Sequence, residues 1–174
     1  MRVDTKYSTA IECALGAALQ NIVVDNENDA KKAIAYLKNN RLGRATFLPL
    51  TSVKPRFFSG RDLDGETGFI GMASTLVGYD KKYETVISYL LGSIAVCDDI
   101  DSAVAIAKKN GYKFKIVTLD GQVVNAGGSL TGGSMAKSAG ILSRSGDIDR
   151  LLKAADEIAA KKAAEEERFD RLKS

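Results

Sequence analysis

The chain has no histidine and no tryptophan among its 174 residues. Without histidine it lacks the base of Ser-His and Cys-His catalysis and the most common transition-metal ligand. Two cysteines without histidine also cannot complete a structural zinc site. These absences count against hydrolytic and zinc enzymes, although carboxylate or lysine chemistry stays open. We therefore expect no catalytic residues, no metal and no cofactor.

Cysteine is scarce as well: there are only Cys13 and Cys97, and both lie in apolar segments. Free cysteine behaves as a small hydrophobic residue, so buried thiols are expected rather than a disulfide. No apolar run approaches the roughly 20 residues that span a bilayer. The first residues also lack the apolar stretch of a signal peptide. We expect a cytoplasmic protein without a membrane segment.

The composition that remains is an ordinary globular mixture, 45% hydrophobic and 27% charged. This length suits one domain or two small subdomains. The formal net charge is +3. Residues 1–146 are mildly basic, whereas residues 147–174 are dense in charges of both signs. The body and the tail are therefore expected to have different physical roles.

Apolar spacing predicts alternating helices and strands in the first half of the chain. They are a helix over Lys6–Leu15, a strand over Ile22–Val24, a helix over Ala30–Asn39 with Ala33, Ile34 and Leu37 on one face, and a strand over Arg44–Leu50. Asn28 or Asp29 is expected to cap the second helix. Pro49 restricts the last strand to a strand end or a sheet edge. Residues 51–71 are rich in turn formers and are expected to form a long loop.

The same order of elements returns in the second half. It comprises a helix over Lys81–Leu91, a strand over Ile94–Cys97, a helix capped by Asp99 or Asp101 that runs to Asn110, and a strand over Lys113–Leu119. Asp120-Gly121 is a strong hairpin signal, with Gln122–Asn125 as the return strand. The repetition predicts an α+β fold with two pseudo-repeated small α/β subdomains. We place the first subdomain with its connecting loop at residues 1–75 and the second at residues 76–146.

Residues 147–174 are predicted to form a C-terminal helix, with Asp147 as its N-cap. Apolar residues from Ile148 to Leu172 recur at alternating spacings of three and four, the a/d pattern of a coiled coil. Lys162 and Glu165 interrupt this pattern. A lone helix of this kind is marginal in water, so we expect its partner strand in a longer parent chain.

Two motifs of ligand binding fail on close inspection. A phosphate loop needs glycine directly before its lysine, but Ala136 precedes Lys137. A calcium loop that starts at Asp98 needs glutamate at its twelfth position, where Lys109 stands. The glycine-rich segment Ala126–Ser138 is therefore expected to form a tight turn or a close contact with another protein. Its two glycine doublets are Gly127, Gly128, Gly132 and Gly133.

Lysine and arginine form two groups that contain no acidic residue. The residues proposed to contact DNA are Lys31, Lys32, Lys38, Arg41, Lys54, Arg56, Arg61, Lys108 and Lys109. Lys113 and Lys115 extend the second group, and Phe47, Phe57 and Phe58 lie near the first. Basic surface with interleaved aromatic residues suits phosphate contact and base stacking. Weak, sequence-independent DNA binding is one interpretation; the other is an ordinary solvated face whose counter-charges come from folding.

Several motifs in a fixed order resemble the hinge of the structural maintenance of chromosomes (SMC) family, in its bacterial chromosome-segregation form. They are Lys6-Tyr7 with Ala10-Ile11-Glu12 and Ala14-Leu15-Gly16, then Leu19–Val24, Ala33-Ile34, Tyr36-Leu37-Lys38, Gly43–Leu50, Leu119-Asp120-Gly121, Gly127-Gly128, Thr131–Ser134, and Leu142 with Arg144. The resemblance covers about residues 5–146, and the tail resembles the start of the returning coiled coil.

The resemblance implies a function in assembly. Hinges of this family lie in the middle of a very long chain and join two copies into a two-fold, ring-like dimer. The glycine doublets match the family's dimer-contact motif, so Gly127, Gly128, Gly132 and Gly133 are expected at the interface. Family hinges can also bind DNA, and the ATPase lies in a separate head domain. The residues before Met1 that would complete the outgoing coil are absent, which leaves the partner of the C-terminal helix open.

Two other functions were weighed. The first is a primary DNA-binding module in which dimerisation is incidental; a monomer with strongly salt-dependent binding would favour it. The second is a small enzyme that uses carboxylates such as Asp62, Asp64 and Glu66. Nothing in the sequence supplies an evident nucleophile and base for it.

Overall fold

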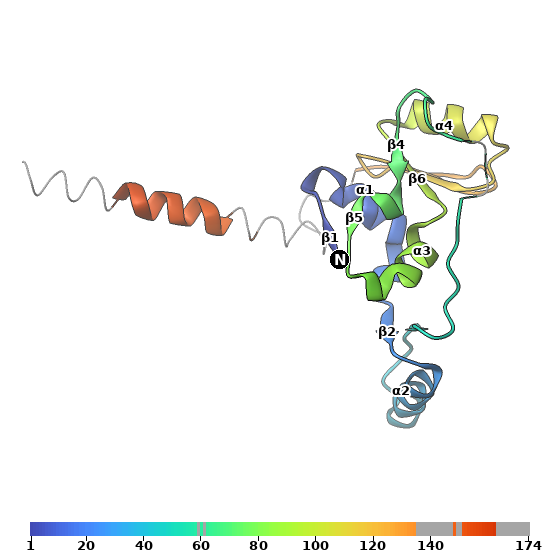
Figure 1. Cartoon of the computed structure of the whole chain (residues 1–174), viewed down its shortest axis with the longest axis vertical. Helices are drawn as coiled ribbons and strands as arrows, with labels where there is room; N and C mark the ends of the chain where they lie inside the picture. The colour runs from blue at the N-terminus through green and yellow to red at the C-terminus, as the bar shows by residue number, and fades with distance from the viewer. Residues whose placement is uncertain (59, 61, 135–147, 149–150, 163–174) are drawn as a thin grey trace, which may run out of the picture.

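Helices and strands alternate along the chain (Figure 1). This computed structural model describes residues 1–58, 60, 62–134, 148 and 151–162. The helices are α1 (Thr5–Leu15), α2 (Glu27–Asn40), α3 (Glu84–Leu91) and α4 (Ile100–Lys109), with short 3-10 turns η1 (Gly16–Gln20), η2 (Ala73–Thr75) and η3 (Lys81–Tyr83). The strands are β1 (Arg2–Val3), β2 (Ile22–Val24), β3 (Phe47–Pro49), β4 (Phe69–Met72), β5 (Val77–Gly78), β6 (Ile94–Cys97), β7 (Lys115–Thr118), β8 (Val123–Val124) and β9 (Leu130–Thr131).

A five-stranded sheet in the order β4-β6-β7-β8-β9 forms the centre of the larger body. Side chains alternate between its faces, as strand geometry requires. Ile94 and Val96 pack on one side with residues of α1 and α3, whereas Ala95 and Cys97 pack on the other with residues of α4. The sheet thus lies between two helical layers, which bury both faces of its central strands β6 and β7.

The unit β2–α2–β3 forms a separate, thinner lobe at the lower end of the molecule in Figure 1. β2 and β3 pair in parallel, and they form a sheet of two strands. Within β2, α2 and β3, all of which the structure describes, only Ala30 and Leu48 are buried. Ile22, Val23, Ile34 and Tyr36 are exposed instead. This lobe therefore has little core of its own.

The predicted repetition appears in the strand pairing. β2 and β3 are parallel around α2, and β6 and β7 are parallel around α4. The surroundings of the two units differ, however. α1 comes from the first half of the chain, yet Ala10 and Ile11 pack in the same core as Val117 of β7. The first helix therefore covers the sheet of the second half, and the lobe of β2, α2 and β3 is left with one helix.

Several predictions of local structure need correction. α2 begins earlier than expected because Asn26, and not Asn28 or Asp29, is its N-cap: its Oδ1 accepts the N–H groups of Asn28 and Asp29 at 3.0 and 3.1 Å. Ile34 lies exposed, so the predicted apolar face of α2 is not buried. The predicted loop 51–71 ends sooner, since β4 begins at Phe69. Pro49 does end an edge strand, as expected.

The predicted C-terminal helix is present over residues 151–162, where every residue is exposed. Its proposed cap Asp147 and its positions Glu165, Phe169 and Leu172 lie outside the described residues. Leu151, Leu152 and Ile158 are each more than half exposed. Pairing with another helix would cover such side chains.

Candidate functional site

Among the residues that the structure describes, β9 is the outermost strand of the large sheet and pairs only with β8. Asn125 donates its N–H to the Ser129 carbonyl at 2.8 Å across this ladder. Backbone groups of successive residues in an antiparallel strand point alternately toward and away from the partner. The N–H and C=O of Leu130 therefore point away from β8, toward the open edge. The Leu130 side chain is 61% exposed beside them.

One glycine doublet shapes the turn that leads into β9. Gly127 and Gly128 have φ of 87° and 93°, which side chains on L-residues disfavour. The Gly127 N–H donates to the Tyr112 carbonyl at 2.8 Å, and the Gly128 N–H donates to the Asn125 carbonyl at 2.9 Å. These bonds fix the turn to the segment after α4. The direction of β9 is therefore set by glycine geometry.

The other doublet follows β9 and lies against one side chain. The Gly133 N–H donates to Gln122 Oε1 at 3.0 Å, and Gln122 Nε2 donates to the Gly133 carbonyl at 3.3 Å. A Cβ at Gly132 would meet Gln122 Oε1 at 1.9 Å. Both predicted glycine pairs thus flank the same exposed strand, and Gly127, Gly132 and Gly133 are themselves exposed.

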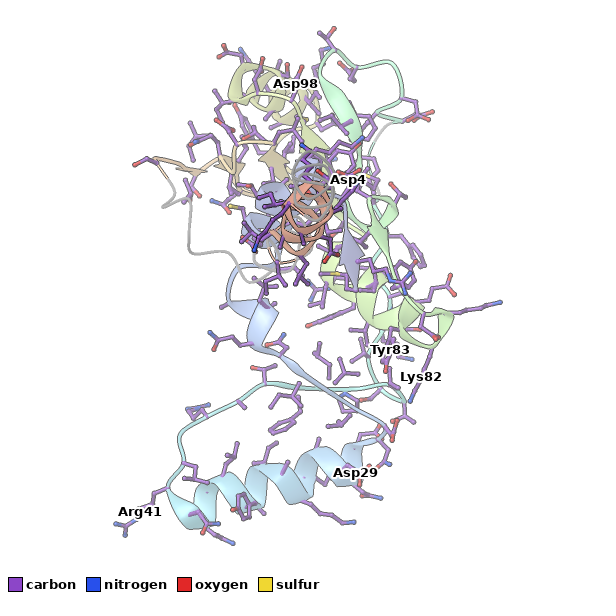
Figure 2. All side chains as sticks on the ribbon, turned by 90° about the vertical axis from the view of Figure 1, so that its left-hand side faces the viewer. Asp4, Asp29, Arg41, Lys82, Tyr83 and Asp98 are labelled. Atoms are coloured by element: carbon purple, nitrogen blue, oxygen red, sulfur yellow. The ribbon has the colours of Figure 1, made fainter. Side chains whose placement is uncertain are left out.

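The structure does not bring the two predicted basic groups together. Lys31, Lys32, Lys38 and Arg41 belong to α2 and its C-terminal end, whereas Lys108 and Lys109 end α4. α2 and α4 lie at opposite ends of the molecule (Figure 1), and Figure 2 shows Arg41 at the bottom and Asp98, next to α4, near the top. Lys109 also forms an ion pair with Glu66 at 2.5 Å. Arg61 lies outside the described residues.

Arg56 has other basic neighbours, which the sequence did not reveal as a group. It lines a cavity of about 430 Å³ together with Lys113 and Lys115. Aromatic rings also face this cavity, contributed by Phe57, Phe58, Tyr89 and Phe114. The runs of sequence that supply the lining come from both halves of the chain. Spacing alone could not show that they meet.

The acidic cluster before α4 acts in helix capping. Asp99 Oδ1 accepts the Ser102 N–H at 2.8 Å, as the sequence predicted. This bond lowers the pKa of Asp99, because it stabilises the carboxylate. Among the residues that the structure describes, no group of three or more potential ligands could hold a metal ion.

Neither cysteine forms a disulfide, as expected, and Cys13 is half-buried. Cys97 is buried in β6, and burial raises its pKa to about 12, with Asp98 and Asp99 adding to the effect. Burial also raises the pKa of Cys13. A thiol is nucleophilic only as the thiolate, so neither environment activates sulfur. In the described part of the chain, no helix combines the length and the apolar character needed to cross a membrane.

Comparison with known proteins agrees with this architecture. The family described as "SMC proteins Flexible Hinge Domain" matches residues 1–107. The chromosome partition protein Smc of Bacillus subtilis is 44% identical over 98% of this chain, and that of Methanocaldococcus jannaschii is 43% identical over 91%. The chain spans only 15% and 13% of the lengths of these two relatives.

Solved structures give the same result. The SMC hinge domain of Geobacillus stearothermophilus, described as an asymmetric dimer, is 45% identical with a TM-score of 0.80, over 92% of this chain and 65% of that one. The Pyrococcus furiosus SMC hinge domain has a TM-score of 0.64 at 33% identity, over 81% of this chain and 75% of that one. A mixed sheet between helices, together with a smaller parallel β–α–β unit, is the architecture that this chain shares with these hinge domains. The chain belongs to the SMC hinge family.

Proposed function

We propose that this chain joins two copies of a chromosome-organising SMC protein, so that it acts in chromosome condensation and segregation. The observation that carries the proposal is the open edge of β9, which the glycine doublets flank. An unpaired sheet edge is a template for another strand, and proteins normally protect it. The exposed Leu130 and the outward backbone groups of the strand would be covered in a dimer.

The glycines suit such an interface for two reasons. They let a second backbone approach closely, and they fix the turn that presents the strand. A strand added to an open edge gains main-chain hydrogen bonds, which gives affinity without a large apolar patch. In a two-fold dimer each patch occurs twice, once on each copy. Gly127, Gly128, Gly132 and Gly133 are therefore the proposed dimer-interface residues.

The thin lobe of β2, α2 and β3 supports assembly through a separate observation. Ile22, Val23 and Ile34 are exposed on a lobe that buries only Ala30 and Leu48 within these elements. Exposed apolar side chains on a lobe with so small a core would be covered in an assembly. We propose that residues 1–75 and 76–146, which share the large sheet through α1 and β4, both take part in the hinge. The C-terminal helix would pair with a coiled-coil strand of the same parent chain, and ATP hydrolysis would belong to a distant head domain.

DNA contact is a second part of the proposal and rests on the basic residues of α2, of the loop and of α4. Phosphate contacts of this kind are independent of sequence and weaken steeply with salt. A cytoplasmic protein bound at the nucleoid would meet DNA at high local concentration. A salt titration of binding to duplex DNA tests this part: binding that salt leaves unchanged, or no binding at low salt, would contradict it.

Sedimentation of the chain over a wide range of concentrations tests the assembly function. We expect a mass of twice 18.6 kDa at micromolar concentration that persists into the nanomolar range. A monomer at the highest concentration would contradict the proposal. A monomer that still binds DNA with a steep salt dependence would favour the alternative function, a DNA-binding module.

A further inference from the structure

We propose that the cavity beside Arg56 binds a nucleobase together with its phosphate, as carried by single-stranded nucleic acid or by a free nucleotide. The inference rests on the DNA contact in the proposed function and gives it a particular place. The cavity combines an exposed aromatic ring on an anchored loop, basic side chains and a suitable size.

The loop that holds Phe57 is fixed on both sides of that residue. The carbonyl of Arg56 accepts the hydroxyl of Ser88 at 3.1 Å, at the end of α3. The Phe58 ring meets the Phe114 ring edge to face, with the centroids 4.6 Å apart. Phe57 lies between these two contacts and is nevertheless 74% exposed. An aromatic ring that is open to solvent and attached to an anchored backbone can stack on a ligand, and only its own side-chain rotation has to be ordered.

Positive charge surrounds the same opening. Arg56 lies over the Tyr89 ring at 4.6 Å from its centroid, and Lys115 Nζ donates to the Ala14 carbonyl at 3.2 Å. Lys113 completes the group from the segment before β7. No aspartate or glutamate belongs to the described residues that line the cavity. A cleft lined by one sign of charge concentrates ligands of the opposite sign, so the cavity favours an anion.

The exposed aromatic ring and the basic side chains together indicate which class of ligand the cavity binds. A small inorganic anion would use the basic side chains but leave the exposed ring of Phe57 without a partner. A purely apolar ligand would leave the three cations uncompensated. A nucleotide unit satisfies both, because its base can stack on an aromatic ring while its phosphate meets arginine or lysine. The cavity volume of about 430 Å³ lies within the range of about 300–1,000 Å³ that is typical of small-molecule sites. Paired bases in a duplex have their faces covered, so an unpaired base fits better.

Fluorescence anisotropy with a labelled oligothymidine of about ten nucleotides tests the site. Phe57→Ala removes the exposed ring, and Tyr36→Ala is its control, since Tyr36 is 62% exposed on α2. We expect Phe57→Ala to weaken binding at least about fivefold and Tyr36→Ala less than about twofold. Lys113→Gln and Lys161→Gln remove the same charge, the second on the exposed C-terminal helix, and Lys113→Gln should weaken binding more. Equal effects within both pairs would overturn the proposal.

Further arms of the experiment separate the sources of the ligand. Competition by thymidine monophosphate would show that a free nucleotide suffices; binding of the oligonucleotide alone, still dependent on Phe57, would show that a strand is needed. If Phe57→Ala weakened the binding of duplex DNA as strongly as that of the oligonucleotide, the proposal of an unpaired base would be wrong. If the unsubstituted chain bound neither single-stranded nor duplex DNA, the proposed DNA contact itself would be contradicted. Retained duplex binding without any effect of Phe57 would contradict only this site.

Discussion

The carbonyl oxygen of Arg56 lies 2.1 Å from the position that a Cβ of Gly92 would occupy. The loop before β4 can therefore approach the end of α3 only because residue 92 has no side chain. We expect Gly92→Ala to lower the free energy of unfolding by about 1–3 kcal/mol, because either the loop at Arg56 or the end of α3 must move to make room for the new Cβ. Urea denaturation measures this. Gly78→Ala is the control, because its Cβ would have only ordinary contacts, at 3.7 Å and beyond.

The thiol of Cys97 predicts how stability depends on pH. Its pKa is about 12 when folded, against 9.0 for the unperturbed thiol. Above pH of about 9 the unfolded chain loses the proton that the folded chain keeps, so stability falls as pH rises. Between pH 8 and pH 10 the free energy of unfolding of the unsubstituted chain should fall by about 1 kcal/mol more than that of Cys97→Ala. Denaturation curves at both pH values give the difference; identical losses would show that the thiol ionises in the folded state.

The N-cap of α2 gives a prediction about helix stability. Asn26 accepts two backbone N–H groups, whereas Asn28 contributes only its own N–H to the cap. Asn26→Ala should therefore destabilise the protein by about 1 kcal/mol, and Asn28→Ala should have little effect. Thermal unfolding of the two variants provides the comparison. A larger effect at Asn28 would support the cap that the sequence pattern suggested.

Lysines of α2 and α4 should contribute unequally to DNA binding. Lys109 already forms an ion pair with Glu66, whereas Lys31 and Lys38 are exposed residues of α2. We expect Lys31→Gln with Lys38→Gln to lower the slope of log affinity against log salt concentration by about one per residue. Lys109→Gln should leave that slope nearly unchanged. The affinity for duplex DNA, measured at several salt concentrations, gives the slope for each variant. If Lys109→Gln also lowered the slope by about one, the Lys109–Glu66 ion pair would have to open so that Lys109 can contact phosphate.

The sequence predicted the regular elements well where periodicity was strong. α1, β2, α3, β6, α4 and β7 lie close to their expected ranges, because each has an apolar pattern, a cap or a stop glycine of its own. β1, β4, β5 and β9 were missed, and β4 begins inside the predicted loop 51–71. β1, β5 and β9 have two residues each, too few for an alternating pattern, and each is a strand only because a partner lies beside it.

Long-range relations were beyond the reach of local patterns. Nothing in the pattern of residues 5–15 shows that Ala10 and Ile11 pack beside Val117. In the same way, Arg56 and Lys113 are far apart in sequence and meet only through the packing of the loop on α3 and Phe114. The glycine doublets were noticed from composition and resemblance. Their position on either side of an edge strand is a property of the folded sheet.

The central claim is that the outer edge of β9 joins two copies, and one matched pair of variants tests it most directly. Leu130 and Leu152 are each 61% exposed, the first on β9 and the second on the C-terminal helix. Sedimentation should show that Leu130→Lys weakens the affinity of the dimer at least about tenfold, because charge on a buried edge opposes pairing, whereas Leu152→Lys leaves this affinity unchanged. If Leu130→Lys stays as fully dimeric as Leu152→Lys, the edge of β9 is not the dimer interface.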